Sequence, residues 1–321
     1  MTPQDLENRI VRYGELQPCK TAFIDAHTPG SDQKENFTII GGGVSESPDQ
    51  HVHIGLPHGF NIGAAGQPPR VRNSLHTHRT AEVFFVLSGR WRFFWGRYGD
   101  AGEVILEKGD IFNIPTGIFR GFENIGEDYA MIMAVLGGDD AGGGVVWAPQ
   151  VIEDAADHGL ILAETGKLYD TKKGQSLPDG VKPMAKLSEE EANSFGAPTS
   201  SEVIQGYVRR YLDLYGMADT APAKVIGETA SIRDKPGFEV DFITRGSALT
   251  TKQTSDKPTV LMPVTGHWRV RCAGLSKTLA PGATMSVPEN TAYTCEPSMT
   301  GEAGLYRVVA TNDPAGLTWT S

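Results

Sequence analysis

The chain repeats one β-strand pattern, and this duplication constrains its fold more than any other feature. LSGRWRFFWG at residues 87–96 and VTGHWRVRCA at 264–273 both read Gly-x-Trp-Arg-apolar. Upstream of each, HGFNI at 58–62 is similar to PGFEV at 236–240. Similar segments that recur in the same order predict two copies of one β-domain.

A turn further downstream fits the same alignment. When Gly109 is set on Gly282, Pro115 and Pro288 follow six residues later in the two copies. Around such turns, valine, isoleucine, phenylalanine and tryptophan alternate with polar residues in short runs, which glycine (38 residues) and proline (20 residues) separate. We therefore expect an all-β protein with two small barrels.

Helical signals lie at the N-terminus and between the two β-rich blocks. Thr2 is a typical N-cap before Pro3, and Ser188 is another before EEEANSF. The pattern predicts four units, which are an N-terminal extension with a helix (residues 1–45), a first barrel (46–140), a helical linker (141–222) and a second barrel (223–321).

Composition excludes several classes of function. Lys and Arg number 29 against 39 Asp and Glu, a formal net charge of −10 without a basic run, so we expect no nucleic-acid partner. No apolar stretch approaches the length that crosses a bilayer, so we expect no membrane partner. Cys19, Cys272 and Cys295 are too scattered for a disulfide framework and are typical of a reducing, cytoplasmic location.

SLHTHRTAEVFFVLSG at 74–89 places three coordinating side chains before an apolar strand. Side chains alternate along a strand, so His76 and His78 share a face, and Glu82 has the same parity. On one straight strand, residues 76 and 82 would lie about 20 Å apart. We therefore expect a turn at 79–81 that returns Glu82 to the two imidazoles. Such a facial triad suits Fe(II) and tolerates Mn, Ni or Zn.

The spacing of these residues resembles that of a known family, the cupins. The matches to the two cupin motifs are His76-x-His78-x3-Glu82-x6-Gly89 and, with one substitution, Gly109-x5-Pro115-x-Gly117-x2-Arg120-x3-Asn124. Together with the duplication, the whole chain resembles a bicupin, as found among gentisate and quercetin dioxygenases and oxalate decarboxylases. The resemblance implies two double-stranded β-helix (jelly-roll) barrels and a metal site in the first.

Two positions depart from the cupin pattern. The first motif usually opens with glycine where this chain has Arg70, which matters little to ligation. The second motif should end in a metal-binding histidine where this chain has Arg120, which has five donors and no lone pair. Three alternatives follow: the metal has three protein ligands, another histidine supplies a fourth, or Arg120 pairs with Glu82 and no metal binds.

Further residues are candidates for the substrate pocket. His51, His53 and His58 lie in a loop that the second copy lacks and could reach the metal or the substrate. The alternative is that they are loop histidines near the barrel mouth, since no carboxylate follows them at ligand spacing. Phe84 and Phe112 are the candidates for the pocket wall, whereas most other aromatic residues of this block are expected in the core.

The second copy lacks the coordinating chemistry. The positions aligned with His76, His78, Glu82 and Arg120 are Gln253, Ser255, Thr259 and Tyr293. None of these is a good metal ligand. We expect the second barrel to be a packing or dimerisation partner, with a small-molecule pocket as the alternative.

The sequence favours a metal-dependent oxidoreductase, an Fe(II) dioxygenase that acts on a small anionic or enolisable compound. Arg120 would be a catalytic residue that holds a carboxylate or enolate through its planar fork. Two alternatives share the fold: a small-molecule-binding cupin with no metal or a structural one, and a metal-assisted isomerase, cyclase or lyase. The resemblance to bicupins also implies a homodimer.

Overall fold

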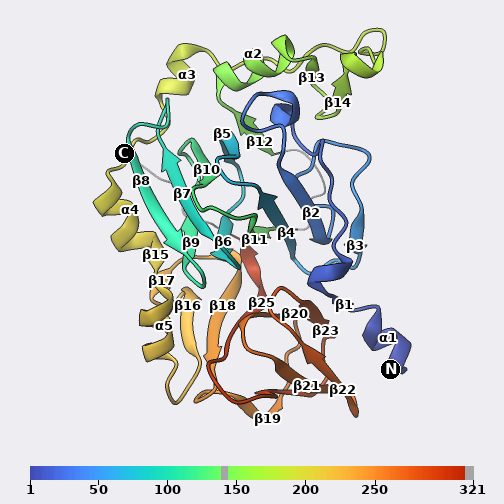
Figure 1. The fold of residues 1–321 in the computed structure, drawn as a ribbon, viewed down its shortest axis with the longest axis vertical. Coiled ribbons are helices and arrows are strands. Elements are labelled where there is room, and N and C mark those ends of the chain that lie inside the picture. Colours follow the sequence, from blue (N-terminus) through green and yellow to red (C-terminus); the bar gives the residue numbers. More distant parts are fainter. Residues whose placement is uncertain (139–143, 315–321) are drawn as a thin grey trace.

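The computed structural model describes residues 1–138 and 144–314, which form two β-barrels, one above the other in Figure 1. The expected boundary at 140/141 lies outside the described residues. Within these ranges the strands form five sheets, and the short helices lie in the N-terminal segment and between the barrels. The prediction of a two-barrel, all-β fold is confirmed.

Two sheets form the first barrel. The seven-stranded sheet has the order β15 (Val208–Arg209), β9 (Ile111–Ile114), β6 (Glu82–Val86), β11 (Ala130–Gly137), β4 (Phe60–Gln67), β2 (Glu35–Ile40) and β3 (Val52–Ile54). The five-stranded sheet has the order β12 (Val145–Trp147), β5 (Arg72–His78), β10 (Arg120–Asn124), β7 (Arg90–Trp95) and β8 (Gly102–Glu107). Large side chains such as Phe84, Trp91 and Phe93 pack between them.

The second barrel has the same plan. Its seven-stranded sheet has the order β1 (Ile10–Val11), β23 (Thr284–Val287), β20 (Thr259–Thr265), β25 (Gly304–Pro314), β18 (Pro236–Thr244), β16 (Ala223–Gly227) and β17 (Ile232–Arg233). Its four-stranded sheet has the order β19 (Leu249–Gln253), β24 (Tyr293–Pro297), β21 (Trp268–Cys272) and β22 (Leu275–Leu279). A core that includes Leu261, Trp268 and Tyr293 fills its interior.

One hydrogen bond shows that the two copies are equivalent. In the first barrel the buried Trp91 donates its indole N–H to the carbonyl of Ser88, at 2.9 Å. In the second barrel the aligned Trp268 donates to the carbonyl of Thr265, at 3.1 Å. Each tryptophan therefore stabilises the turn before its own strand in the same way, which agrees with the repeated Gly-x-Trp-Arg pattern.

The N-terminal segment contributes to both barrels. After Thr2 caps the short helix α1 (Pro3–Glu7), the chain leaves the helix and β1 pairs with β23 of the second barrel. The helix is therefore only five residues long. Two 3-10 helices follow, η1 (Tyr13–Glu15) and η2 (Ile24–His27), before β2 joins the first barrel.

The segment between the barrels contains most of the helical residues of the described chain. It contains α2 (Pro149–Asp157), β13 (Leu160–Leu162), β14 (Leu168–Asp170), η3 (Thr171–Lys173), α3 (Glu189–Asn193), α4 (Ser200–Tyr207) and α5 (Tyr211–Met217). Figure 1 shows α2 above the first barrel and α4 and α5 along one side, toward the second. Ser188 caps α3 as predicted, through a capping box with Glu191. None of the helices in the described ranges is long and apolar enough to span a membrane.

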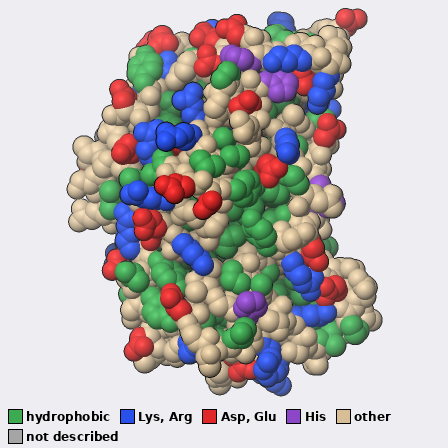
Figure 2. Space-filling model, in the orientation of Figure 1, with side chains coloured by type: hydrophobic (Ala, Val, Ile, Leu, Met, Phe, Trp, Pro, Cys, Tyr) green, Lys and Arg blue, Asp and Glu red, His purple; other side chains and the backbone are tan. Residues whose placement is uncertain are grey.

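The barrels meet through a largely apolar interface, because one cluster of buried hydrophobic residues contains side chains of both barrels. Phe60 of the first barrel lies edge-to-face with Phe238 of the second, with ring centroids 5.7 Å apart. The Tyr306 hydroxyl crosses the interface to the carbonyl of Gly109, at 2.7 Å. On the face shown in Figure 2, hydrophobic side chains gather in the middle of the molecule, among charged side chains of both signs. Hydrophobic burial therefore dominates the contact between the barrels.

Candidate metal centre

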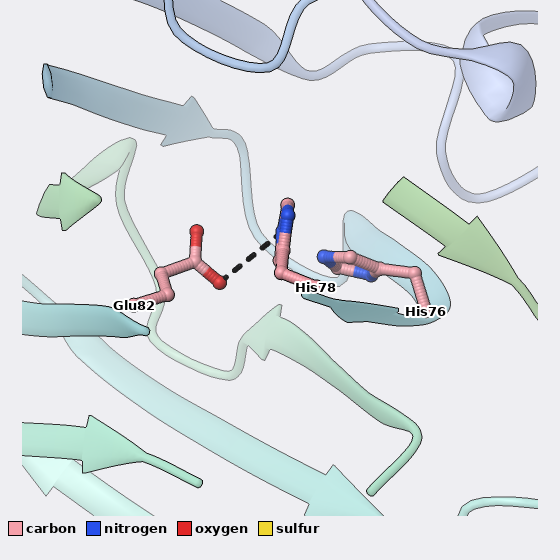
Figure 3. Close-up of side chains that lie close together, drawn as sticks. All are labelled: His76, His78 and Glu82. Atoms are coloured by element: carbon pink, nitrogen blue, oxygen red, sulfur yellow. Dashed lines mark ion pairs between the residues drawn. The ribbon is translucent and has the colours of Figure 1, made fainter. Parts of the chain in front are cut away.

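The predicted turn brings two histidines and one glutamate together. β5 ends at His78, the chain bends at 79–80, and β6 begins at Glu82 in the facing sheet. One ligand atom from each of His76, His78 and Glu82 lies within 4.8 Å of the others (Figure 3). All three side chains are buried. They form a single group of potential metal ligands within the described ranges.

Local contacts set the tautomer and the orientation of the His76 ring. Its Nδ1–H donates to the carbonyl of Ser74 at 2.7 Å, which leaves Nε2 with the lone pair. The ring lies 5.1 Å from the Trp147 ring, which limits its rotation. Burial, and then the charge of Arg120, hold the pKa of His76 well below its usual range, so the imidazole stays neutral.

His78 and Glu82 face each other. The Nε2 atom of His78 lies 3.4 Å from Oε2 of Glu82, and its Nδ1 atom is buried without a hydrogen-bond partner in the described structure. Burial and the nearby Arg120 hold the pKa of His78 well below its usual range. Burial raises the pKa of Glu82, and the Arg120 charge opposes this shift. Two neutral imidazoles thus lie beside one carboxyl group.

Arg120 pairs with Glu82, as one of the sequence alternatives proposed. It begins β10 opposite His76, donates from one terminal nitrogen to the His76 carbonyl at 2.7 Å and from the other to the Glu82 carboxylate. Its side chain is 2% exposed, and burial lowers its pKa. Arg120 is also absent from the lining of the adjacent cavity. Its guanidinium therefore holds a metal-ligand candidate in place, and the geometry does not favour the anion clamp expected from sequence.

The donor set fits a divalent transition metal. Two neutral imidazoles and a carboxylate are the ligands that Fe(II), Mn, Ni and Zn accept. The Glu82 contact to Arg120 uses Oε2, so Oε1 keeps its lone pairs. A metal held by His76, His78 and Glu82 would have its remaining positions toward the cavity that all three residues line.

The cavity lies inside the first barrel, and its space, including the part that is open to solvent, is about 600 Å³. Its wall is largely apolar and includes four phenylalanines, Phe23, Phe37, Phe84 and Phe122, together with small residues of β4. The side-chain amides of Asn36 and Asn73 add polar groups to the wall, and Nδ2 of Asn36 is buried without a partner in the described structure. Such a pocket suits a small molecule with an apolar body and an oxygen acceptor.

The two aromatic candidates for the pocket wall lie at different depths. Phe84 lines the cavity, whereas Phe112 does not, although the two are direct cross-strand partners on β6 and β9. Phe112 packs on Phe93 and Trp95 with ring centroids 5.5 and 6.3 Å away and is completely buried. It belongs to the core beneath the cavity.

The three loop histidines lie away from the cluster. His51 is exposed and stacks edge-to-face with His53, whose Nδ1 contacts the Thr38 carbonyl on the outer β2–β3 edge. His58 is buried between the barrels, where its Nε2 lies 2.7 Å from the Ser286 hydroxyl. None of the three lines the cavity. In the described structure, no histidine from this loop joins His76, His78 and Glu82 as a fourth ligand.

The second barrel keeps the framework without the cluster. Gln253 pairs with Tyr293 between β19 and β24, as His76 pairs with Arg120 between β5 and β10. The alignment made from sequence therefore matches the strand register at this point. The candidate metal centre belongs to the first barrel.

Three buried charged residues behind the site gave no sequence signal. They are Asp25, Lys34 and Glu46, all from the N-terminal segment. No motif or periodic pattern marks them, because they are scattered along an irregular segment and their contacts to the site are with Asn73, Ser74 and Trp147, in other parts of the chain. A run of charged residues in a polar loop is ordinarily expected in solvent.

Comparisons with known proteins agree with this architecture. A model of the cupin domain matches residues 66–136. Oxalate decarboxylase of Lactobacillus farciminis, solved with formate, is 12% identical with a TM-score of 0.54, and the match covers 96% of this chain and 87% of that one. The vicilin of Solanum melongena is 11% identical with a TM-score of 0.56, covering 96% and 86%. Among curated protein sequences, none matches the chain.

Residues 66–136 are therefore a cupin domain, and the chain as a whole has the two-barrel fold of bicupins. This domain contains the complete His76–His78–Glu82 cluster. At such low identities the solved structures show the fold alone. They include an oxalate decarboxylase and a vicilin, so the fold does not select a reaction.

Proposed function

We propose that the protein is a metal-dependent oxidoreductase of the Fe(II) dioxygenase type that acts on a small organic compound. One observation carries this proposal: a buried group of two histidines and one glutamate borders a largely apolar cavity in the first barrel. A site with few protein ligands that borders a largely apolar pocket suits chemistry at a bound metal. When bound, the metal would supply Lewis-acid and redox chemistry.

The residues of the chain would bind and orient the substrate. The phenylalanine-rich wall would take up an apolar body and exclude water. The amides of Asn36 and Asn73 would donate to an oxygen of the substrate, as a carboxylate or enolate provides. Arg120 would keep Glu82 oriented and compensate part of its charge. We therefore keep a small anionic or enolisable compound as the substrate class.

A second candidate function is a metal-free protein that binds a small molecule. The buried ion pair between Arg120 and Glu82 favours it, because it satisfies the carboxylate without a cation. The vicilin of Solanum melongena carries different anionic ligands in structurally similar pockets. A metal-assisted isomerase, cyclase or lyase would use the same site as the oxidoreductase.

Metal content separates the first two functions. We expect protein purified without a metal-binding tag to contain about one Fe, Mn, Ni or Zn ion per chain, because only the first barrel offers a triad in the described ranges. Elemental analysis with a matched protein assay measures this. No metal after purification and after incubation with Fe(II) would support the metal-free protein, and two ions per chain would contradict the assignment of the second barrel.

Oxygen uptake separates the oxidoreductase from the isomerase, cyclase or lyase. We expect the iron-loaded protein to consume dioxygen when it is supplied with a small enolisable or phenolic compound that it converts. An oxygen electrode measures this under air and under nitrogen. Turnover that continues equally well without oxygen would assign the site to a non-oxidative reaction.

We also propose that the protein is a cytoplasmic homodimer. The three cysteines are free, which suits a reducing compartment. Light scattering on the eluting protein would measure its mass, and a value of one chain across the micromolar range would contradict the dimer.

A further inference from the structure

A buried ion pair of the N-terminal segment lies behind the metal-ligand candidates. The Lys34 ammonium group contacts the Asp25 carboxylate, and the two side chains are 1% and 0% exposed. Burial lowers the pKa of Lys34, and Asp25 opposes the shift. Removing two charges from water is costly, so this pair is weak evidence for stability by itself. Its role is better judged from the other groups that the two side chains contact.

The pair contacts two of the neighbours of the His76 ring, Ser74 and Asn73. The second carboxylate oxygen of Asp25 accepts from the backbone N–H of Ser74 at 3.0 Å, and Lys34 donates to Oδ1 of Asn73 at 2.8 Å. The Ser74 carbonyl in turn accepts the Nδ1–H of His76. The Asn73 amide nitrogen lies 3.4 Å from the same ring nitrogen. Asp25 and Lys34 thus act on one imidazole through two different neighbours.

Glu46, from the same N-terminal segment, provides a third and indirect connection to His76, through Trp147. The Glu46 carboxylate accepts from the backbone N–H of Ile24 at 2.8 Å and from the Trp147 indole at 2.6 Å. Trp147 lies against the His76 ring. Glu46 therefore joins the residue next to Asp25 with the aromatic neighbour of the imidazole.

We propose that Asp25 and Lys34 are positioning residues for His76. Asp25 fixes the segment whose Ser74 carbonyl accepts the Nδ1–H, and so favours the tautomer that leaves Nε2 for a metal. Lys34 holds Asp25 and the Asn73 side chain, which packs beside the ring and limits its orientation. This inference rests on the proposed metal-dependent function. Loss of such outer contacts typically weakens metal binding 10–100-fold.

A double variant of the full chain tests the inference. Asp25→Leu combined with Lys34→Met removes both charges together, whereas either single change would leave one buried charge unpaired and destabilise the fold. We expect the double variant to bind Co(II), used as a spectroscopic probe, about 10–100-fold more weakly than the unaltered protein. Titration followed by the visible absorption of Co(II) gives the dissociation constants.

A matched pair in the second barrel provides the control. Arg307 and Asp241 form an ion pair at 2.6 Å with side chains 18% and 13% exposed, on strands far from the cluster in sequence. Asp241→Leu combined with Arg307→Met should leave the Co(II) dissociation constant unchanged. A loss of affinity in both double variants would attribute the effect to general destabilisation and overturn the inference.

The tautomer of His76 gives a second readout in metal-free protein. Nitrogen-15 chemical shifts should show mainly the Nδ1–H form in the unaltered protein and the control, and a mixture in Asp25→Leu/Lys34→Met. Unchanged tautomer and unchanged Co(II) affinity in that variant would overturn the positioning role and leave the metal centre intact. If the unaltered protein bound no Co(II), the proposed metal-dependent function would fail and the inference with it.

Discussion

Arg120→Ala should lower the free energy of unfolding of the metal-free protein by about 3–5 kcal/mol, the usual effect of removing one partner from a buried ion pair. The guanidinium is 2% exposed and contacts the Glu82 carboxylate, which is itself buried. Without Arg120, that carboxylate must stay desolvated beside a neutral imidazole or take up a proton. Urea unfolding at pH 8 in the presence of a chelator measures the loss.

Arg12→Ala is the matched control, because Arg12 forms an ion pair with Glu7 at 2.6 Å while both side chains stay well exposed. Exposed pairs contribute about 0–1 kcal/mol. A loss for Arg120→Ala no larger than that of the control would show that Arg120 does not stabilise Glu82.

The pH dependence of this loss has a defined sign. Burial raises the folded-state pKa of Glu82 above its usual value of 4.5, and the charge of Arg120 opposes the shift. A raised carboxyl pKa gives a contribution to stability that is fully present below the unfolded-state pKa and is lost as pH rises through the folded one. Arg120→Ala raises that pKa further. The difference in unfolding free energy between variant and unaltered protein should therefore be smaller at pH 5 than at pH 8.

His76→Ala should weaken metal binding at least about 100-fold, beyond what the loss of an outer contact causes, because a three-ligand site loses one of its donors. The fold should persist, since the neutral imidazole leaves no buried charge behind when it is removed. Glu82→Ala would be a less specific test, because it leaves Arg120 unpaired. Metal titration and near-ultraviolet circular dichroism measure binding and folding separately.

His53→Ala is the control for His76→Ala, since His53 lies on the outer edge strand β3 and should not affect the metal. Full metal occupancy in His76→Ala would remove the triad from consideration.

Strand geometry allowed much of this arrangement to be predicted from sequence. The parity of His76, His78 and Glu82, with the turn required between them, specified the cluster that the structure contains. The duplicated pattern specified two barrels and the register that pairs Gln253 with Tyr293. These predictions succeeded because they depend on spacing along one or two neighbouring strands.

Other features depend on depth within the barrel and on distant contacts. Phe112 is a candidate for the pocket wall from sequence, but the sequence could not show that its side chain packs into the core on Phe93 and Trp95 and does not line the cavity. The sequence could not show which anion lies beside Arg120. In the structure its guanidinium contacts the buried carboxylate of Glu82. Asp25 and Lys34 reach the site from a separate segment, so no local pattern could connect them with His76.

The pairing of β1 with β23 has a consequence for how the chain folds. Arg9 contacts Ser286 across 277 residues of sequence, so the edge strand β1 of the seven-stranded sheet in the second barrel is far along the chain from its partner β23. During synthesis β1 cannot pair until β23 has been made, and closing so long a loop is entropically costly. Such non-local pairing favours slow, late assembly of this edge. A gene fragment encoding the second barrel alone would leave the β23 edge unpaired and prone to association with other strands.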